Sequence, residues 1–151
     1  MCLYDVKRIR IEEDITVYKV LQISGKRKFK YHSPYYKTEW TEGVRKSVPE
    51  NQWARMERVI QNFDSINKGA YHSFKTLASA KSELRRLESW EKARSYVAKK
   101  MDPDSNSVPA KYVICEFVIP KDSKYVYVGE YSTHSHKDCY ASSDLIFKKA
   151  L

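Results

Sequence analysis

The amino-acid sequence predicts an α+β fold, in which one long amphipathic helix packs on a mixed or mainly antiparallel sheet. Two stretches, DITVYKVLQI at residues 14–23 and KYVICEFVIP at 111–120, are rich in β-branched and aromatic residues, as buried strands are. Between them, apolar residues from Leu77 to Val97 recur every three or four positions, which is the period of a helix with one buried face. A chain of 151 residues suits a single core, so we expect one domain over residues 1–151.

The first third of the chain predicts short strands around one long strand. Residues 14–23 are continuously apolar rather than alternating, so both faces of that strand should be covered. GKRKFKY at 25–31 alternates basic and aromatic residues, as an edge strand or an exposed hairpin arm does. YYKTEWTEGVRKSV at 35–48 predicts a short strand, a turn near Gly43 and another short strand.

Two helices are indicated in the middle of the chain. PENQWARMERVIQNF at 49–63 places apolar residues at helical spacing, although a long irregular excursion fits the same residues; the apolar residues are Trp53, Met56 and Ile60. The longer helix should cover about 76–99, with the Thr76 hydroxyl accepting a hydrogen bond from a main-chain N–H of the first turn. Lysine and arginine lie opposite its apolar stripe, which consists of Leu77, Ala80, Leu84, Leu87, Trp90, Ala93 and Val97.

Loops and strands alternate in the last third of the chain. MDPDSNSVP at 101–109 has the proline, aspartate and serine content of a loop. The buried strand at 111–120 is followed by a strand-like KYVYVGEY at 124–131, and SSDLIFKKAL at 142–151 should supply the last strand. THSHKDC at 133–139 is most simply interpreted as a polar loop.

The charge balance favours polyanionic partners. Lysine and arginine number 28 against 19 aspartates and glutamates, a formal charge of +9, and such an excess attracts phosphate-bearing molecules. One tight basic cluster lies beside aromatic residues and predicts either a nucleic-acid contact or a solvated face; its members are Lys26, Arg27, Lys28 and Lys30. A host protein is a further partner class, because tyrosine, of which the chain has 12, is common at protein interfaces.

Membrane association and secretion are not expected. No stretch approaches the ~18 consecutive apolar residues that a membrane-spanning helix requires. The N-terminal MCLYDVKRIRIEED lacks the apolar core of a signal peptide, and the three cysteines, Cys2, Cys115 and Cys139, cannot all pair within one chain. We therefore expect free thiols in a reducing compartment, which indicates a cytoplasmic location.

Several short motifs occur in an order that resembles a known family. They are DITVYKVL, then SPYY, then GAYHSFKTL at 69–77, and later CEFVIPKDSKYVYVG and YASSDL. This order is similar to a family of small uncharacterised proteins carried by gut Bacteroidetes and their phages, whose members also often begin Met-Cys-Leu. The resemblance covers nearly the whole chain, and it implies one domain and a phage or mobile-element setting.

A second resemblance is to the ADP-ribosyltransferase-like fold. It rests on the order of a strand carrying Tyr-Lys, a Gly-x-x-His-x-Phe step, a helix and a following apolar strand. Enzymes of that fold grip NAD with residues on three successive strands. The resemblance implies a contact from Tyr18 or Lys19 on the first strand. It implies a contact from Tyr71 or His72 on the second and a catalytic glutamate on the third, for which the candidates are Glu116 and Glu130.

His72 is the strongest single candidate for a site residue. A histidine titrates near neutral pH, so it can act as an acid or a base or orient a phosphate. A partly buried ring that is held by a backbone carbonyl at a strand–helix junction is the alternative interpretation. The main-chain N–H groups at the start of the following helix would favour an anion. The ligand-binding candidates around this position are Lys19, Tyr35, Tyr71, His72, Ser73, Lys75 and Thr76.

The THSHKDC segment also contains residue types that bind metals. On an extended segment His134 and His136 would share a face, and the Cys139 thiolate could approach the same ion. A closed zinc site needs a fourth ligand from elsewhere in the chain, and a polar loop explains the same residues, so we do not expect a metal. An N-terminal nucleophile at Cys2, exposed by removal of the initiating methionine, is a minor alternative.

Catalytic signatures are scarce in the sequence. It has no Walker phosphate loop, dinucleotide-binding glycine fingerprint, nucleophile elbow or zinc-finger spacing. We therefore favour a small phage or mobile-element binding protein that holds a nucleotide-like or phosphate-bearing ligand and so counters or modulates a host pathway. The alternatives are an ADP-ribosyltransferase-like enzyme, with NAD as its cofactor, and a protein-interaction or structural module.

Overall fold

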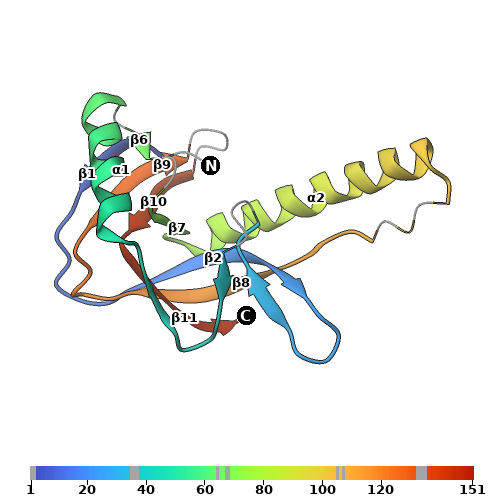
Figure 1. Cartoon of the computed structure of the whole chain (residues 1–151), viewed down its shortest axis with the longest axis horizontal. Helices are drawn as coiled ribbons and strands as arrows, with labels where there is room; N and C mark the ends of the chain where they lie inside the picture. The colour runs from blue at the N-terminus through green and yellow to red at the C-terminus, as the bar shows by residue number, and fades with distance from the viewer. Residues whose placement is uncertain are drawn as a thin grey trace.

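A computed structural model describes residues 3–34, 38–63, 65–66, 69–104, 106, 108–131 and 136–151. Its central feature is one strongly bent sheet with two helices against it (Figure 1). The strands are β1 (Leu3–Arg8), β2 (Ile15–Ser24), β3 (Lys30–His32), β4 (Glu39–Trp40), β5 (Arg45–Ser47), β6 (Ser65–Ile66), β7 (Tyr71–Phe74), β8 (Lys111–Ile119), β9 (Val126–Tyr131), β10 (His136–Ser142) and β11 (Asp144–Ala150). The helices are α1 (Glu50–Phe63) and α2 (Leu77–Met101). The predicted α+β fold is thereby confirmed.

The sheet follows the order β5-β11-β8-β2-β7-β10-β9-β1-β6, and β3 and β4 branch from β2. The strand pairs of the described residues are antiparallel throughout. One edge of β2 pairs with β8 over its whole length, from Ile15 opposite Ile119 to Ile23 opposite Lys111. These two strands are the continuously apolar stretches of the sequence, and together they form the centre of the sheet.

The other edge of β2 is shared between two partners. Tyr18 pairs with Phe74 of β7, whereas Gln22 and the residues after it pair with β3. Between these two contacts, residues 19–21 have no paired residue on that edge among the described strands. The sheet therefore has a local opening at the middle of β2, and both of its faces border this opening.

The expected covering of both faces of β2 is confirmed. Val17 and Leu21 belong to one buried cluster, which includes Phe117, Phe147 and Trp40. Val20 belongs to the other cluster, to which the two helices contribute. Successive side chains of a strand point to opposite faces of the sheet. Because β2 has apolar residues on both faces, it contributes to both buried clusters.

Helix α1 confirms the prediction of a helix after Pro49. Its side chains Trp53 and Met56 are only 2% and 3% exposed. The Trp53 indole stacks on the Tyr125 ring with the ring centroids 4.5 Å apart, and this contact fixes the helix against the strands. The alternative of an irregular excursion is thereby ruled out.

Helix α2 is where it was predicted, but its apolar stripe is only half used. The Thr76 hydroxyl accepts a hydrogen bond from the Ser79 N–H at 3.2 Å and so caps the helix. The buried positions end at Glu91, whose carboxylate accepts a hydrogen bond from the Tyr112 hydroxyl at 3.2 Å. Beyond this point the helix projects from the body (Figure 1).

The projecting half of α2 corrects the expectation that the whole stripe packs on the sheet. Trp90 and Val97, both predicted to pack, are 55% and 53% exposed, and Met101 is 84% exposed. The helical period identified the apolar face correctly, but the sheet ends before the helix does. Among the described residues, no helix is both long enough and apolar enough to cross a membrane.

One prediction for the short strands was wrong and another is confirmed. The THSHKDC segment was expected to be a loop, but strand β10 begins at His136 and runs between β7 and β9. The residues at 35–48 contain the two predicted short strands and the turn near Gly43; β4 pairs with β3, and β5 pairs with β11. The partners of β5 and β10 come from distant parts of the sequence.

Candidate ligand-binding site

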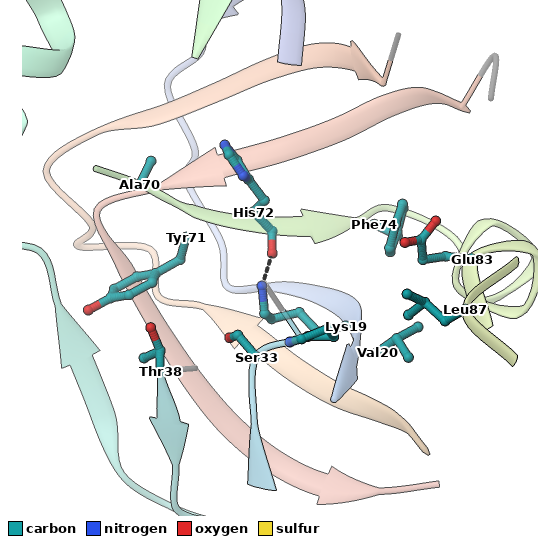
Figure 2. Close-up of a pocket in the computed structure, with 11 residues that line it drawn as sticks. Lys19, Val20, Ser33, Thr38, Ala70, Tyr71, His72, Phe74, Glu83 and Leu87 are labelled. Atoms are coloured by element: carbon teal, nitrogen blue, oxygen red, sulfur yellow. Dashed lines mark hydrogen bonds between the residues drawn. The ribbon is translucent and has the colours of Figure 1, made fainter. Parts of the chain in front are cut away.

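A small pocket lies at the opening in the sheet. Its volume is about 70 Å³, and its lining residues are Lys19, Val20, Ser33, Pro34, Thr38, Ala70, Tyr71, His72, Phe74, Glu83 and Leu87. They come from β2, from the residues after β3 and before β4, from β7 with the residue before it, and from the buried face of α2 (Figure 2). The pocket thus exists because β2 changes partners at this point.

Lys19 supplies the positive charge of the pocket. It lies on the same face of β2 as Val17 and Leu21, where a third apolar residue would continue the pattern. The Lys19 ammonium donates a hydrogen bond to the main-chain carbonyl oxygen of His72, drawn as a dashed line in Figure 2. It forms no ion pair with any carboxylate of the described residues. Burial lowers the pKa of Lys19 to about 8, because little around the ammonium replaces its water.

His72 is buried at the wall of the pocket, with 5% of its surface exposed. Its ring points away from the Lys19 ammonium, while its carbonyl oxygen points toward it (Figure 2). The ring nitrogen Nε2 is buried and has no hydrogen-bond partner among the described residues. Burial, followed by the charge of Lys19, lowers the pKa of His72 to about 3. At neutral pH the imidazole is therefore uncharged, so it adds no positive charge to the pocket.

The remaining polar groups of the pocket differ in how many partners they have. The Ser33 hydroxyl accepts a hydrogen bond from the Trp40 indole at 2.9 Å. The Glu83 carboxylate is bound by the Arg86 guanidinium through two contacts, at 2.6 and 2.9 Å. Burial, and then the charge of Asp144, raises the pKa of Tyr71, so the phenol stays protonated and can donate a hydrogen bond.

Three of the predicted ligand-binding residues line this pocket together: Lys19, Tyr71 and His72. Ser73 is buried on the face of β7 opposite His72, and within the described part of the chain its hydroxyl has no hydrogen-bond partner. Lys75 and Thr76 are exposed at the start of α2 and do not line the pocket. Tyr35 lies outside the described residues.

The two candidate glutamates do not lie at this pocket. Glu116 is opposite Tyr18 in β8, which places it on the face of the sheet away from Lys19. Glu130 is exposed on β9 opposite Tyr4. The triad implied by the resemblance to ADP-ribosyltransferases, with His72 and one of these glutamates at a common site, is not assembled here.

The predicted basic cluster lies in the turn between β2 and β3 and at the first residue of β3. Its members, Lys26, Arg27, Lys28 and Lys30, are exposed and do not contribute to the pocket. Gly25 begins the turn with a φ of +98°, and a Cβ at that position would lie only 2.5 Å from the carbonyl oxygen of Lys28. The expectation of an exposed hairpin arm is confirmed, and its contact with nucleic acid stays a prediction.

The predicted metal ligands fall largely outside what can be described. His134 lies outside the described residues, and only the backbone of His136 is described. Cys139 is buried in β10, opposite Phe74. Within the described part of the chain, no three histidine, cysteine, aspartate or glutamate side chains are grouped as a metal site requires.

Sequence reasoning missed the residues that complete the pocket, namely Val20, Ser33, Pro34, Thr38, Ala70, Phe74, Glu83 and Leu87. One signal for the site was present in the sequence: Lys19 is a charged residue between two apolar residues, Val17 and Leu21, that share its face of the strand. Comparisons with protein-family models, with curated proteins and with solved structures find no match for this chain. Both resemblances noted in the sequence therefore stay predictions.

Proposed function

We propose that the chain is a small binding protein that holds a phosphate-bearing or nucleotide-like anion at the opening in the sheet, with Lys19 as its anchor. The observation that carries this proposal is the state of the Lys19 ammonium. It is partly buried and, among the described residues, has one hydrogen-bond partner, the carbonyl oxygen of His72, where an ammonium can donate three hydrogen bonds.

An anion in this pocket would relieve the cost of burying the ammonium. A cation in an apolar environment is stabilised by a counter-ion with good hydrogen-bond geometry, and charge-assisted hydrogen bonds are the strong ones. The Thr38 hydroxyl lies at the same pocket and can donate to a further oxygen of a phosphate. The largely apolar remainder of the lining would exclude water from these contacts.

Binding is better supported than catalysis at this site. The neutral His72 ring, with its pKa near 3, is a poor acid at physiological pH. The Glu83 carboxylate already forms two contacts with Arg86. We therefore favour a binding protein over an NAD-dependent transferase.

The test is a titration of the protein with inorganic phosphate and ribose 5-phosphate, followed by NMR of the β2 and β7 amides. Lys19→Met should weaken binding by roughly tenfold or more, since a lost charge-assisted hydrogen bond is worth about 1.5–3 kcal/mol. The matched control is Lys149→Met, because Lys149 is an exposed lysine of the same sheet that does not line the pocket.

The affinity should also fall as the pH rises above about 8, the pKa of Lys19. The anion binds the protonated amine, so loss of the proton removes the attraction. If both variants bind phosphate as tightly as the wild type, Lys19 is not the anchor and the proposal is wrong.

A further inference from the structure

A second cavity adjoins the Lys19 pocket. It has a volume of about 280 Å³ and is lined by Thr38, Val48, Pro49, Gln52, Gly69, Ala70 and Tyr71. Thr38, Ala70 and Tyr71 also line the Lys19 pocket, so the two cavities meet at these residues. In Figure 2 these three residues lie on the side of the pocket away from Leu87 and α2. The other residues that line the second cavity, Val48, Pro49, Gln52 and Gly69, do not line the Lys19 pocket.

The two cavities differ in their chemistry. The Lys19 pocket contains an ammonium, whereas none of the residues that line the second cavity carries a charge at neutral pH. Val48, Pro49 and Ala70 offer apolar surface, and the Gln52 side-chain amide can both donate and accept hydrogen bonds. A neutral group with a polar edge suits such a cavity, and a charged group does not.

Size points the same way. A volume of about 70 Å³ accommodates little more than the head of an anion. Small-molecule pockets usually measure roughly 300–1,000 Å³, and the site enters that range only when the second cavity is included. Tyr71 lines both cavities, so its ring can contact the body of a ligand whose charged end lies at Lys19.

We infer that the two cavities form one site for a small organic anion, whose charged end lies at Lys19 and whose uncharged ring lies between Pro49, Gln52 and Tyr71. This inference rests on the proposed function of Lys19 as an anion anchor. It adds the class of ligand: an aromatic or heterocyclic phosphate or carboxylate, of which a nucleoside monophosphate is one source and an aromatic acid another.

The experiment is a set of titrations with orthophosphate, phenyl phosphate, uridine 5′-monophosphate and benzoate, measured by NMR. Phenyl phosphate and the nucleotide should bind at least about tenfold more tightly than orthophosphate, since burial of a ring contributes at least ~1.4 kcal/mol. Gln52→Trp should fill the second cavity and abolish this advantage, while orthophosphate affinity changes less than about twofold. The control is Arg55→Trp, at an exposed position of α1 that does not line the cavity.

The outcomes separate this inference from the proposed function. If orthophosphate binds at Lys19 but the ring adds nothing, or if Gln52→Trp leaves the advantage intact, the two-compartment site is wrong and the anion anchor stands. Benzoate binding that depends on Gln52, without phosphate binding, supports the two compartments and overturns the phosphate ligand. If none of the four probes binds, both proposals are overturned.

Discussion

Asp144 and Lys19 are both charged side chains near the interior of this protein, but they differ in how completely they are partnered. The Asp144 carboxylate is 7% exposed, and each of its oxygens accepts hydrogen bonds. Oδ1 accepts from the Ser47 hydroxyl and from the Arg45 guanidinium, at 3.2 Å, and Oδ2 accepts from the Ser143 hydroxyl at 2.7 Å. By contrast, the Lys19 ammonium has one hydrogen-bond acceptor among the described residues, the carbonyl oxygen of His72.

The pKa values of the two groups record this difference. Burial alone would raise the pKa of Asp144, but hydrogen bonds from Ser143, Ser47 and Arg45 outweigh it and lower the pKa. At Lys19 the effect of burial prevails, and the pKa falls to about 8, so the ammonium loses its proton more readily than that of an exposed lysine. Asp144 therefore fastens β11 to β5, whereas Lys19 is left with hydrogen-bonding capacity that a ligand can use.

The largest effect on stability is expected for Asp144→Ala, which removes the fully partnered carboxylate. The substitution leaves the Ser47 and Ser143 hydroxyls and part of the Arg45 charge without their acceptor, so we expect a loss of about 3 kcal/mol in the free energy of unfolding. Urea denaturation measures it. Asp122→Ala removes the exposed partner of Arg45 and should change stability by less than about 0.5 kcal/mol. Equal effects of the two substitutions would refute a structural role for Asp144.

Lys19→Met should act in the opposite direction. Methionine is unbranched and apolar, so it keeps the packing of the lysine chain while removing a poorly solvated charge. We expect the free energy of unfolding at pH 7 to stay the same or to increase by about 1 kcal/mol in urea denaturation. A decrease in the free energy of unfolding as large as that of Asp144→Ala would contradict this expectation and show that the Lys19 ammonium stabilises the fold.

The pH dependence of the free energy of unfolding, compared between the wild type and Lys19→Met, tests the burial of Lys19 separately. The pKa of Lys19 is about 8 in the folded protein, against 10.5 for an unperturbed lysine, so the unfolded chain holds more protons between these two pH values. The stability of the wild type relative to Lys19→Met should therefore rise as the pH increases from about 8 to 10.5 and stay constant below about 7. Parallel curves across this range would mean that Lys19 is well solvated.

The smallest effect is expected at His72. With a folded pKa near 3, its ring should show no change in NMR chemical shift between pH 5 and 8, whereas an unfolded histidine titrates near 6.5. The stability that depends on its neutral form is complete above pH 6.5 and declines as the pH falls below that value. A midpoint near 6.5 in the folded protein would contradict its burial.

Most of the fold could be predicted because its central elements are local patterns. Strands β2 and β8 are recognised by their β-branched and aromatic residues, and helix α2 by apolar residues that recur every three or four positions. Strand β10 has neither, since the buried Cys139 and Ala141 are small and the segment before them is polar. It forms a strand because β7 and β9 flank it, and this pairing of distant segments is not visible in a single sequence.

The candidate site was accessible to sequence reasoning only in part. Lys19, Tyr71 and His72 were each predicted, and the structure places them around one pocket. Their arrangement depends on the register of Tyr18 opposite Phe74, which brings the His72 carbonyl to the Lys19 ammonium across 53 positions of sequence. Glu116 was a misleading candidate because the pleat places it on the opposite face of the sheet.

The projecting half of α2 has an optical consequence. Trp40 and Trp53 are each 2% exposed, whereas Trp90 is 55% exposed, so the three indoles divide into a shielded pair and one that water reaches. Iodide or acrylamide should quench the fluorescence of Trp90 and leave the blue-shifted emission of the other two. Since the centre of the Trp40 ring lies 6.0 Å from the Lys19 ammonium, the Trp40 share of the unquenched emission should change when an anion binds at Lys19.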